Sequence, residues 1–259
     1  MSVLLLPISK EDDLYPLISI CDKIAGYLNY ELLCFTYNNS EKLFKDSFNN
    51  IPIEVNHSTK DLFTTIFSFL HSSSIDVAMI ISSINVVSIQ NRKKTFSFFS
   101  KIRKLIIPYL VLPAVVVPDW KPESILLPIC LSDGEKEASA WAGYLTKSHN
   151  AKVYIIHPNF KDGMLKQYLQ RNIGFIKNLF NNEKVAYEIF LYGYKSKHAS
   201  LKAIEMATEK INSLLVMPVS RRSFLEYLFK VPSEIMLLKS GNDIPILFVS
   251  PRHDLYLPC

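Results

Sequence analysis

The chain carries the stretch VLLLPIS at residues 3–9, and a similar stretch, ILLPIC, at residues 125–130. Each opens a segment that closes on another apolar run, PAVVV at residues 113–117 and PILFV at residues 245–249. The two copies are offset by 121 residues at their start and by 132 at their end. A period this long is typical of a duplicated domain, since solenoid repeats recur every ~20–50 residues. The sequence therefore predicts two copies of one fold.

Apolar runs of strand length alternate with segments of helical periodicity in both copies. The predicted strands cover residues 2–7, 31–36, 51–55, 76–82 and 114–117 in the first copy and residues 124–129, 151–157, 185–192, 213–217 and 244–249 in the second. The predicted helices cover residues 15–29, 41–48, 61–71 and 95–109, then residues 135–148, 163–180, 199–211 and 225–238. This alternation is typical of a parallel sheet with helices on both faces. We therefore predict an α/β fold of two tandem doubly wound domains, at residues 1–118 and 123–252, each with a five-stranded parallel sheet.

Composition indicates a folded protein in a reducing compartment. Apolar residues make up 49% of the 259 residues, which is too many for a disordered chain. No apolar run approaches the ~20 residues that span a bilayer, and the first residues lack the regions of a secretory signal. The four cysteines show no CxxC spacing, so free thiols are the simplest interpretation. We expect a cytoplasmic protein with no membrane contact.

The net charge is +5, and one segment is strongly basic. Residues 92–104 contain six Lys or Arg residues and no acid. A solvated helix face is the favoured interpretation of such a run, and an anion or polyanion site is the alternative. The run carries no nucleic-acid motif, and its phenylalanines suit the core face of a helix. We therefore expect no nucleic-acid partner.

Catalytic and metal-binding signatures are absent from the sequence. The six histidines show no HxxxH or HExxH spacing, which argues against a metal site. Cys130 has no evident basic neighbour that would lower the pKa of its thiol, so a packed thiol is favoured over a nucleophile. The sequence contains no Gly-rich phosphate-binding signature and no pattern of nucleophile, acid and base. We therefore expect a protein that is not an enzyme.

The segment after the predicted fourth strand of the second copy carries the most specific pattern. It reads MPVSRRSFLEYLFKVPSE at residues 217–234 and leads into the closing strand at residues 245–249. This order of strand, loop, helix and closing strand, together with the opening ILLPIC, resembles the universal stress protein family. The resemblance covers both copies, hence nearly the whole chain, and the duplication resembles the tandem members of that family. It implies the strand order 3-2-1-4-5 in each domain.

Nucleotide-binding members of that family carry Gly, two residues, Gly, nine residues, then Gly and Ser or Thr. The glycines let backbone amides approach the phosphates, and the hydroxyl donates to one of them. This chain keeps the spacing and loses the residues, because the four positions hold Pro218, Arg221, Val231 and Pro232. Cys130 stands where the family has an Asp that reaches the base or ribose. The resemblance therefore implies a degenerate nucleotide site.

In open α/β sheets, ligands bind beyond the carboxyl ends of the strands, where the strand order reverses. Any ligand site of the second copy is therefore expected near Cys130, Met217 and Arg221. Arg221 could fill the vacant phosphate space itself, or it could bind a small anion such as sulfate. Filling is slightly favoured, because Pro218 and Pro232 deprive an anion of backbone donors.

The favoured function is that of a non-enzymatic stress-response protein of the tandem universal stress protein type. It would act through protein contacts or through a ligand other than ATP, so no cofactor is expected, and ATP and AMP are disfavoured. The alternative is a nucleotide- or small-anion-binding regulator with a remodelled phosphate site. An adenylating or hydrolytic enzyme is least favoured. Since family members commonly pair through their fifth strands, residues 114–117 and 246–249 are expected to pair within one chain as an intramolecular pseudo-dimer, with a homodimer as a further option.

Overall fold

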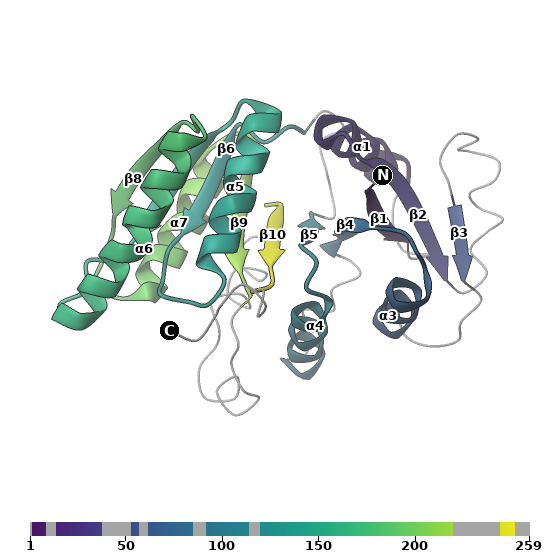
Figure 1. The fold of residues 1–259 in the computed structure, drawn as a ribbon, viewed down its shortest axis with the longest axis horizontal. Coiled ribbons are helices and arrows are strands. Elements are labelled where there is room, and N and C mark those ends of the chain that lie inside the picture. The colour runs from purple at the N-terminus through teal and green to yellow at the C-terminus, as the bar shows by residue number, and fades with distance from the viewer. Residues whose placement is uncertain are drawn as a thin grey trace. The chain divides into compact units, whose positions relative to one another are not determined.

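The computed structural model describes residues 2–8, 14–37, 53–56, 62–84, 92–113, 120–219 and 244–251 of the chain. Contacts divide the chain into two compact units, one of residues 1–88 and 107–120, the other of residues 89–106 and 121–259. In each unit the strands pair in parallel and helices lie between them along the chain (Figure 1). The α/β fold with parallel strands flanked by helices is therefore confirmed. The domain boundaries at residues 118 and 123 stay a prediction.

The described residues of the first unit form five strands in the order β3-β2-β1-β4-β5. They are β1 (Val3–Ile8), β2 (Glu31–Tyr37), β3 (Ile53–Asn56), β4 (Val77–Ser83) and β5 (Tyr109–Leu112). Among the described residues, its helices are α1 (Leu14–Leu28) and α3 (Leu62–Ser72). The order reverses at β1, because Val3 pairs with Glu31 of β2 on one side and with Val77 of β4 on the other. Leu4, Leu5 and Leu6 of β1 are fully buried, so the stretch that opens the sequence repeat forms the centre of this sheet.

The end of the first copy differs from the prediction. The helix predicted over residues 95–109 ends at Leu105, and Tyr109–Leu112 is a strand beside β4. Ile106 has a φ of 57°, in the left-handed region, and Pro108 lacks the N–H that a continuing helix would need. The carbonyl of Pro108 instead accepts from the backbone N–H of Ile80 at 3.0 Å. The strand predicted at residues 114–117 and the helix predicted at residues 41–48 lie outside the described residues.

The described residues of the second unit also form five strands, in the order β10-β9-β6-β7-β8. They are β6 (Ser124–Pro128), β7 (Lys152–His157), β8 (Tyr187–Leu191), β9 (Ser213–Pro218) and β10 (Ile246–Val249). Its helices include α5 (Glu135–His149), α6 (Gly163–Asn182) and α7 (Ser196–Glu209). The order reverses between β6 and β9, which pair in parallel from Ser124 opposite Ser213. The predicted helix at residues 225–238 lies outside the described part of the chain.

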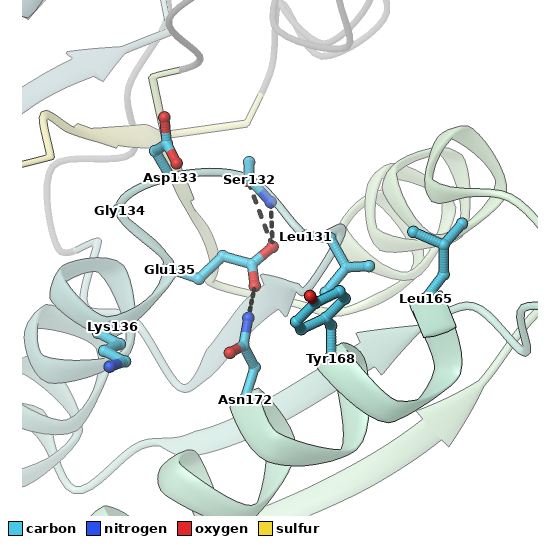
Figure 2. Close-up of a pocket in the computed structure, with 9 residues that line it drawn as sticks. All are labelled: Leu131, Ser132, Asp133, Gly134, Glu135, Lys136, Leu165, Tyr168 and Asn172. Carbon is cyan, nitrogen blue, oxygen red and sulfur yellow. Dashed lines mark hydrogen bonds between the residues drawn. The ribbon is translucent and has the colours of Figure 1, made fainter. Parts of the chain in front are cut away.

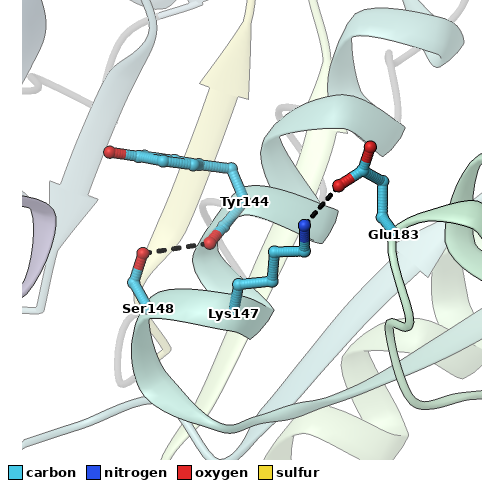
Figure 3. A network of polar contacts seen from close by, with 4 residues as sticks. All are labelled: Tyr144, Lys147, Ser148 and Glu183. Atoms are coloured by element: carbon cyan, nitrogen blue, oxygen red, sulfur yellow. Dashed lines mark hydrogen bonds and ion pairs between the residues drawn. The ribbon is translucent and has the colours of Figure 1, made fainter.

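Helices α5 and α6 pack on each other, and α7 contacts β6, β7 and β9. Because crossovers between parallel strands are right-handed, the strand order places α5 and α6 on one face of the sheet and α7 on the other. Lys147 near the end of α5 forms an ion pair with Glu183, the residue that follows α6 (Figure 3). Beside it, the hydroxyl of Ser148 donates to the carbonyl of Tyr144 at 3.0 Å. Both charges of the pair are half-exposed, so it contributes little to stability.

One helix of the first sequence copy, α4 (Arg92–Leu105), belongs to the second unit. The ring of Phe99 packs edge-on against that of Phe248 in β10, with centroids 5.1 Å apart. The hydroxyl of Ser250 donates to the carbonyl of Ile102 at 3.1 Å. The basic run lies on this helix, where Lys104 is exposed and the guanidinium of Arg103 donates through Nε to the carbonyl of Phe99 at 3.3 Å. Within the described ranges, no helix is both long and apolar enough to cross a membrane.

Candidate functional site

The loop after β6 turns sharply before α5 begins. Gly134 has a φ of 85°, a left-handed conformation that glycine adopts without strain, and it precedes the first residue of α5. That first residue is Glu135, whose side chain points back into the loop (Figure 2). The loop lies at the carboxyl end of β6, where the strand order reverses, so it occupies the place where this class of sheet binds ligands.

The Glu135 carboxylate is the polar centre of the loop. Its Oε1 accepts from the backbone N–H groups of Cys130 at 2.6 Å and Ser132 at 2.9 Å, and from the Ser132 hydroxyl at 3.3 Å. Its Oε2 accepts from the Asn172 side-chain amide at 2.9 Å. The side chain is only 2% exposed, and this burial raises its pKa above the ordinary value, while the four hydrogen bonds act in the opposite direction. Two backbone amides that could bind an external anion are therefore occupied by the chain's own carboxylate.

Cys130 is tied to the first turn of α7. Its Sγ lies 3.4 Å from the carbonyl of Ser196 and 3.5 Å from the hydroxyl of Ser200. Its own carbonyl accepts from the Ser196 hydroxyl at 2.8 Å. The N–H, carbonyl and thiol of Cys130 thus all have partners within the chain. Cys130 therefore connects the β6–α5 loop to the first turn of α7.

The end of β9 lies beside this loop. Pro218 has no N–H, and the N–H of Val219 donates to the carbonyl of Val249 in β10 at 2.9 Å. A Cβ atom added to Gly134 would lie 3.1 Å from Cβ of Pro218 and 3.2 Å from Cβ of Pro251. Two proline rings therefore pack directly on the glycine of the β6–α5 loop. Neither proline offers a backbone donor, so the surface packed on Gly134 is apolar.

The predicted site residues fall into two groups. Pro218 is the last residue of β9, and Cys130 lies in the loop two residues after the end of neighbouring β6; Met217, which precedes Pro218 in β9, is buried. Arg221, Val231 and Pro232 lie outside the described residues, so their predicted places stay predictions.

A pocket of about 430 Å³ opens between the β6–α5 loop and α6 (Figure 2). It is lined by Leu131, Ser132, Asp133, Gly134, Glu135, Lys136, Leu165, Tyr168 and Asn172. Glu135 and Asn172 form its polar part, while Leu165 and Tyr168 of α6 form an apolar wall. In the part of the chain that the structure describes, no three His, Cys, Asp or Glu side chains gather as metal ligands. The pocket therefore offers a mixed apolar and polar surface that carries carboxylates.

Sequence reasoning missed the contribution of α6. Asn172 lies 37 residues after Glu135, and the nucleotide motif does not include this helix. A local signal did exist for Glu135 itself. Ser132 and Glu135 have the Ser-x-x-Glu spacing in which the glutamate reaches back to a backbone N–H, and the structure contains that hydrogen bond.

Neither a family model nor a curated protein matches the chain. Solved structures do match over nearly its whole length. A universal stress protein from Archaeoglobus fulgidus DSM 4304 gives a TM-score of 0.64 at 12% identity, covering 97% of each chain. The chain shares the fold of the universal stress proteins. A candidate universal stress protein from Pseudomonas aeruginosa UCBPP-PA14 gives a TM-score of 0.62 at 14% identity, covering 96% of this chain and 93% of that one. A protein of unknown function from Pseudomonas aeruginosa PAO1 gives 0.62 at 15% identity, with 97% and 93% covered. At these identities the likeness concerns the fold alone.

Proposed function

We propose that the chain is a non-enzymatic protein of the tandem universal stress protein type that does not use ATP and acts through protein contacts. The observation that carries this proposal is the buried carboxylate of Glu135, which accepts from the amides of Cys130 and Ser132. A universal stress protein that binds nucleotide needs free backbone donors at the strand-order reversal. In this chain, the donors on the β6 side already serve an internal anion.

The charge of Glu135 also opposes a phosphate. Two unit charges of like sign 4 Å apart repel by about 4 kcal/mol at an effective dielectric constant of ~20. A phosphate that bound beside the ionised carboxylate would meet this repulsion in addition to the burial that already raises the pKa of Glu135. On the β9 side, Pro218 has no donor and the N–H of Val219 is bonded to Val249. The described ends of β6 and β9 thus both argue against a nucleotide phosphate.

The experiment is a mass spectrum of the small molecules released from freshly purified protein. The proposal predicts that no stoichiometric ATP, ADP or AMP is released after denaturation. A stoichiometric nucleotide would overturn it. A second spectrum of Glu135→Gln controls for the carboxylate, because this variant keeps the size of the side chain and removes its charge.

The alternative is a regulator that binds a small anion at a remodelled phosphate site around Arg221. The sequence favours it by placing an arginine at a phosphate-contacting position, and guanidinium groups bind anions without glycine backbones.

Assembly is a separate proposal. We propose that the two copies pair within one chain through their fifth strands, which would cover two strand edges. A monomeric mass in light scattering, with a cross-link between the two copies, would support the pairing.

A further inference from the structure

Helix α6 carries two apolar stripes. One is buried against the sheet and α5, and it consists of Leu169, Ile173, Ile176 and Phe180. The other is exposed. Its members are Met164, Tyr168 and Phe175, which are 66%, 45% and 41% exposed. Each lies five residues before a member of the buried stripe, namely Leu169, Ile173 and Phe180. At about 100° per residue, a shift of five residues rotates the second stripe by ~140° around the helix. A helix with a single core needs one stripe, so the second is available to a partner.

The exposed stripe continues into the pocket beside it. Leu165, which is 41% exposed, and Tyr168 form the α6 wall of the cavity of about 430 Å³, and Leu131 lines it from the loop (Figure 2). A flat apolar patch would offer contact area alone, whereas this cavity can also receive a protruding side chain. Exposed apolar patches bordered by polar residues mark interaction sites.

The charge beside the stripe is positive. Helix α6 contains three basic residues and no acidic residue. The guanidinium of Arg171 lies 4.7 Å from the ring centroid of Tyr168, and Nζ of Lys136 lies 5.2 Å from that of Phe175. Among the described residues, neither cation forms an ion pair. Each exposed ring of the stripe thus carries a cation that is available to a carboxylate.

We propose that this α6 surface, made of Lys136, Met164, Leu165, Tyr168, Arg171 and Phe175, docks an amphipathic helix of a partner protein that carries acidic residues. The proposal rests on the proposed function, which it deepens by naming the partner's chemistry. From Met164 to Phe175 the stripe spans twelve residues and rises about 16 Å, which matches three turns of a docked helix. Helices that dock in grooves use anchors at i, i+4 and i+7 or i+11, and aromatic residues and arginine dominate the energetics of such surfaces.

An anionic membrane is the competing occupant of a basic, apolar surface. Two features favour a helix. The surface includes a concavity, which a protruding side chain fills better than lipid headgroups do. The same concavity also holds the carboxylates of Asp133 and Glu135, which would repel a sheet of anionic headgroups. A peptide can place an apolar side chain there and direct its acids toward Arg171 and Lys136 instead.

The test uses a displayed library of 18-residue helical peptides, with apolar residues fixed at i, i+4, i+7 and i+11 and the remaining positions varied. Selection against the full chain should enrich peptides with acidic residues beside the apolar stripe. An enriched peptide is then labelled, and its affinity is measured by fluorescence anisotropy. The variants are Arg171→Glu, which reverses one cation of the surface, and Tyr168→Ala, which removes its central ring. Circular dichroism checks that each variant is folded.

Lys177→Glu is the matched control, because it makes the same charge change on an exposed position of the same helix, on the other side of the buried stripe. We expect Arg171→Glu and Tyr168→Ala to weaken binding at least tenfold and Lys177→Glu to change it less than twofold. Equal losses in Arg171→Glu and Lys177→Glu, enrichment of basic peptides, or no enrichment would overturn the proposal. One further outcome would overturn it: the wild type binds vesicles that contain phosphatidylserine, Arg171→Glu abolishes that binding, and no helical peptide binds. Nucleotide released from the purified protein would contradict the proposed function only, so the two failures are distinguishable.

Discussion

Replacing Glu135 with alanine tests the centre of the candidate site. The substitution leaves the N–H groups of Cys130 and Ser132 and the amide of Asn172 without their acceptor. Each buried polar group left without a partner costs about 1–3 kcal/mol. Relief from burying a charge offsets part of this cost, and water entering the pocket can satisfy some of the donors. We therefore expect the free energy of unfolding to fall by about 2–4 kcal/mol.

Glu135→Gln should cost less, about 1 kcal/mol. Its amide oxygen can still accept from Cys130 and Ser132, and Asn172 can rotate its amide to present an oxygen to the new NH₂ group. The assay is urea unfolding at pH 7, followed by the fluorescence of Trp120 and Trp141, with the slope checked for two-state behaviour. Glu137→Ala is the control, because it also removes an acid from the first turn of α5. A loss for Glu135→Ala within about 0.5 kcal/mol of the control would refute the reasoning, since that difference lies within ordinary surface effects.

Three further predictions concern the same region. Because the pKa of Glu135 is raised in the folded state, its native form binds more protons than the unfolded chain just above its ordinary pKa of 4.5. The free energy of unfolding of the wild type, relative to that of Glu135→Gln, should therefore fall as the pH rises from 4.5 through the raised pKa and then level off. Urea unfolding at several pH values measures this difference. A difference that rises with pH would contradict the prediction. Gly134→Ala should destabilise the chain by about 1–3 kcal/mol, since its φ is 85° and the added Cβ would press on Pro218. Gly174→Ala in α6 should instead stabilise the chain by up to ~1 kcal/mol, because no atom lies within 4 Å of the added Cβ. Equal effects of the two substitutions in thermal unfolding would refute the crowding at Gly134. If the remodelled anion site exists, phosphate binding measured by calorimetry should vanish in Arg221→Ala, and unchanged binding would assign Arg221 to packing or to the surface.

Much of the fold could be predicted because apolar runs of strand length are bounded clearly in the second copy. The helix predicted over residues 163–180 is Gly163–Asn182 in the structure. The first copy was harder at one point. Residues 105–117 form an almost continuous apolar run, in which periodicity cannot distinguish the end of a helix from the start of a strand. Pro108 was the available signal, and the strand begins directly after it.

The packing of α4 and the composition of the site depended on tertiary contacts. No local pattern predicts that Phe99 packs on Phe248, because the two residues are far apart in the sequence. The strand-order rule did indicate which strand ends meet, and Cys130 and Pro218 follow from it. Asn172 and Tyr168 could not be predicted in the same way, since they come from α6, on the face of the sheet beside the crevice. Glu135 could have been identified from its spacing to Ser132 alone.

A calorimetric titration of ATP into the purified full chain tests the central claim most directly. A universal stress protein that binds ATP with micromolar affinity has about 8 kcal/mol of binding free energy. Losing two or three charge-assisted hydrogen bonds, each worth about 1.5–3 kcal/mol, would reduce this to the millimolar range or weaker. We therefore predict no measurable heat of binding at micromolar ATP, for the wild type and for Arg221→Ala alike. A saturable micromolar isotherm with one or two sites per chain would contradict the account.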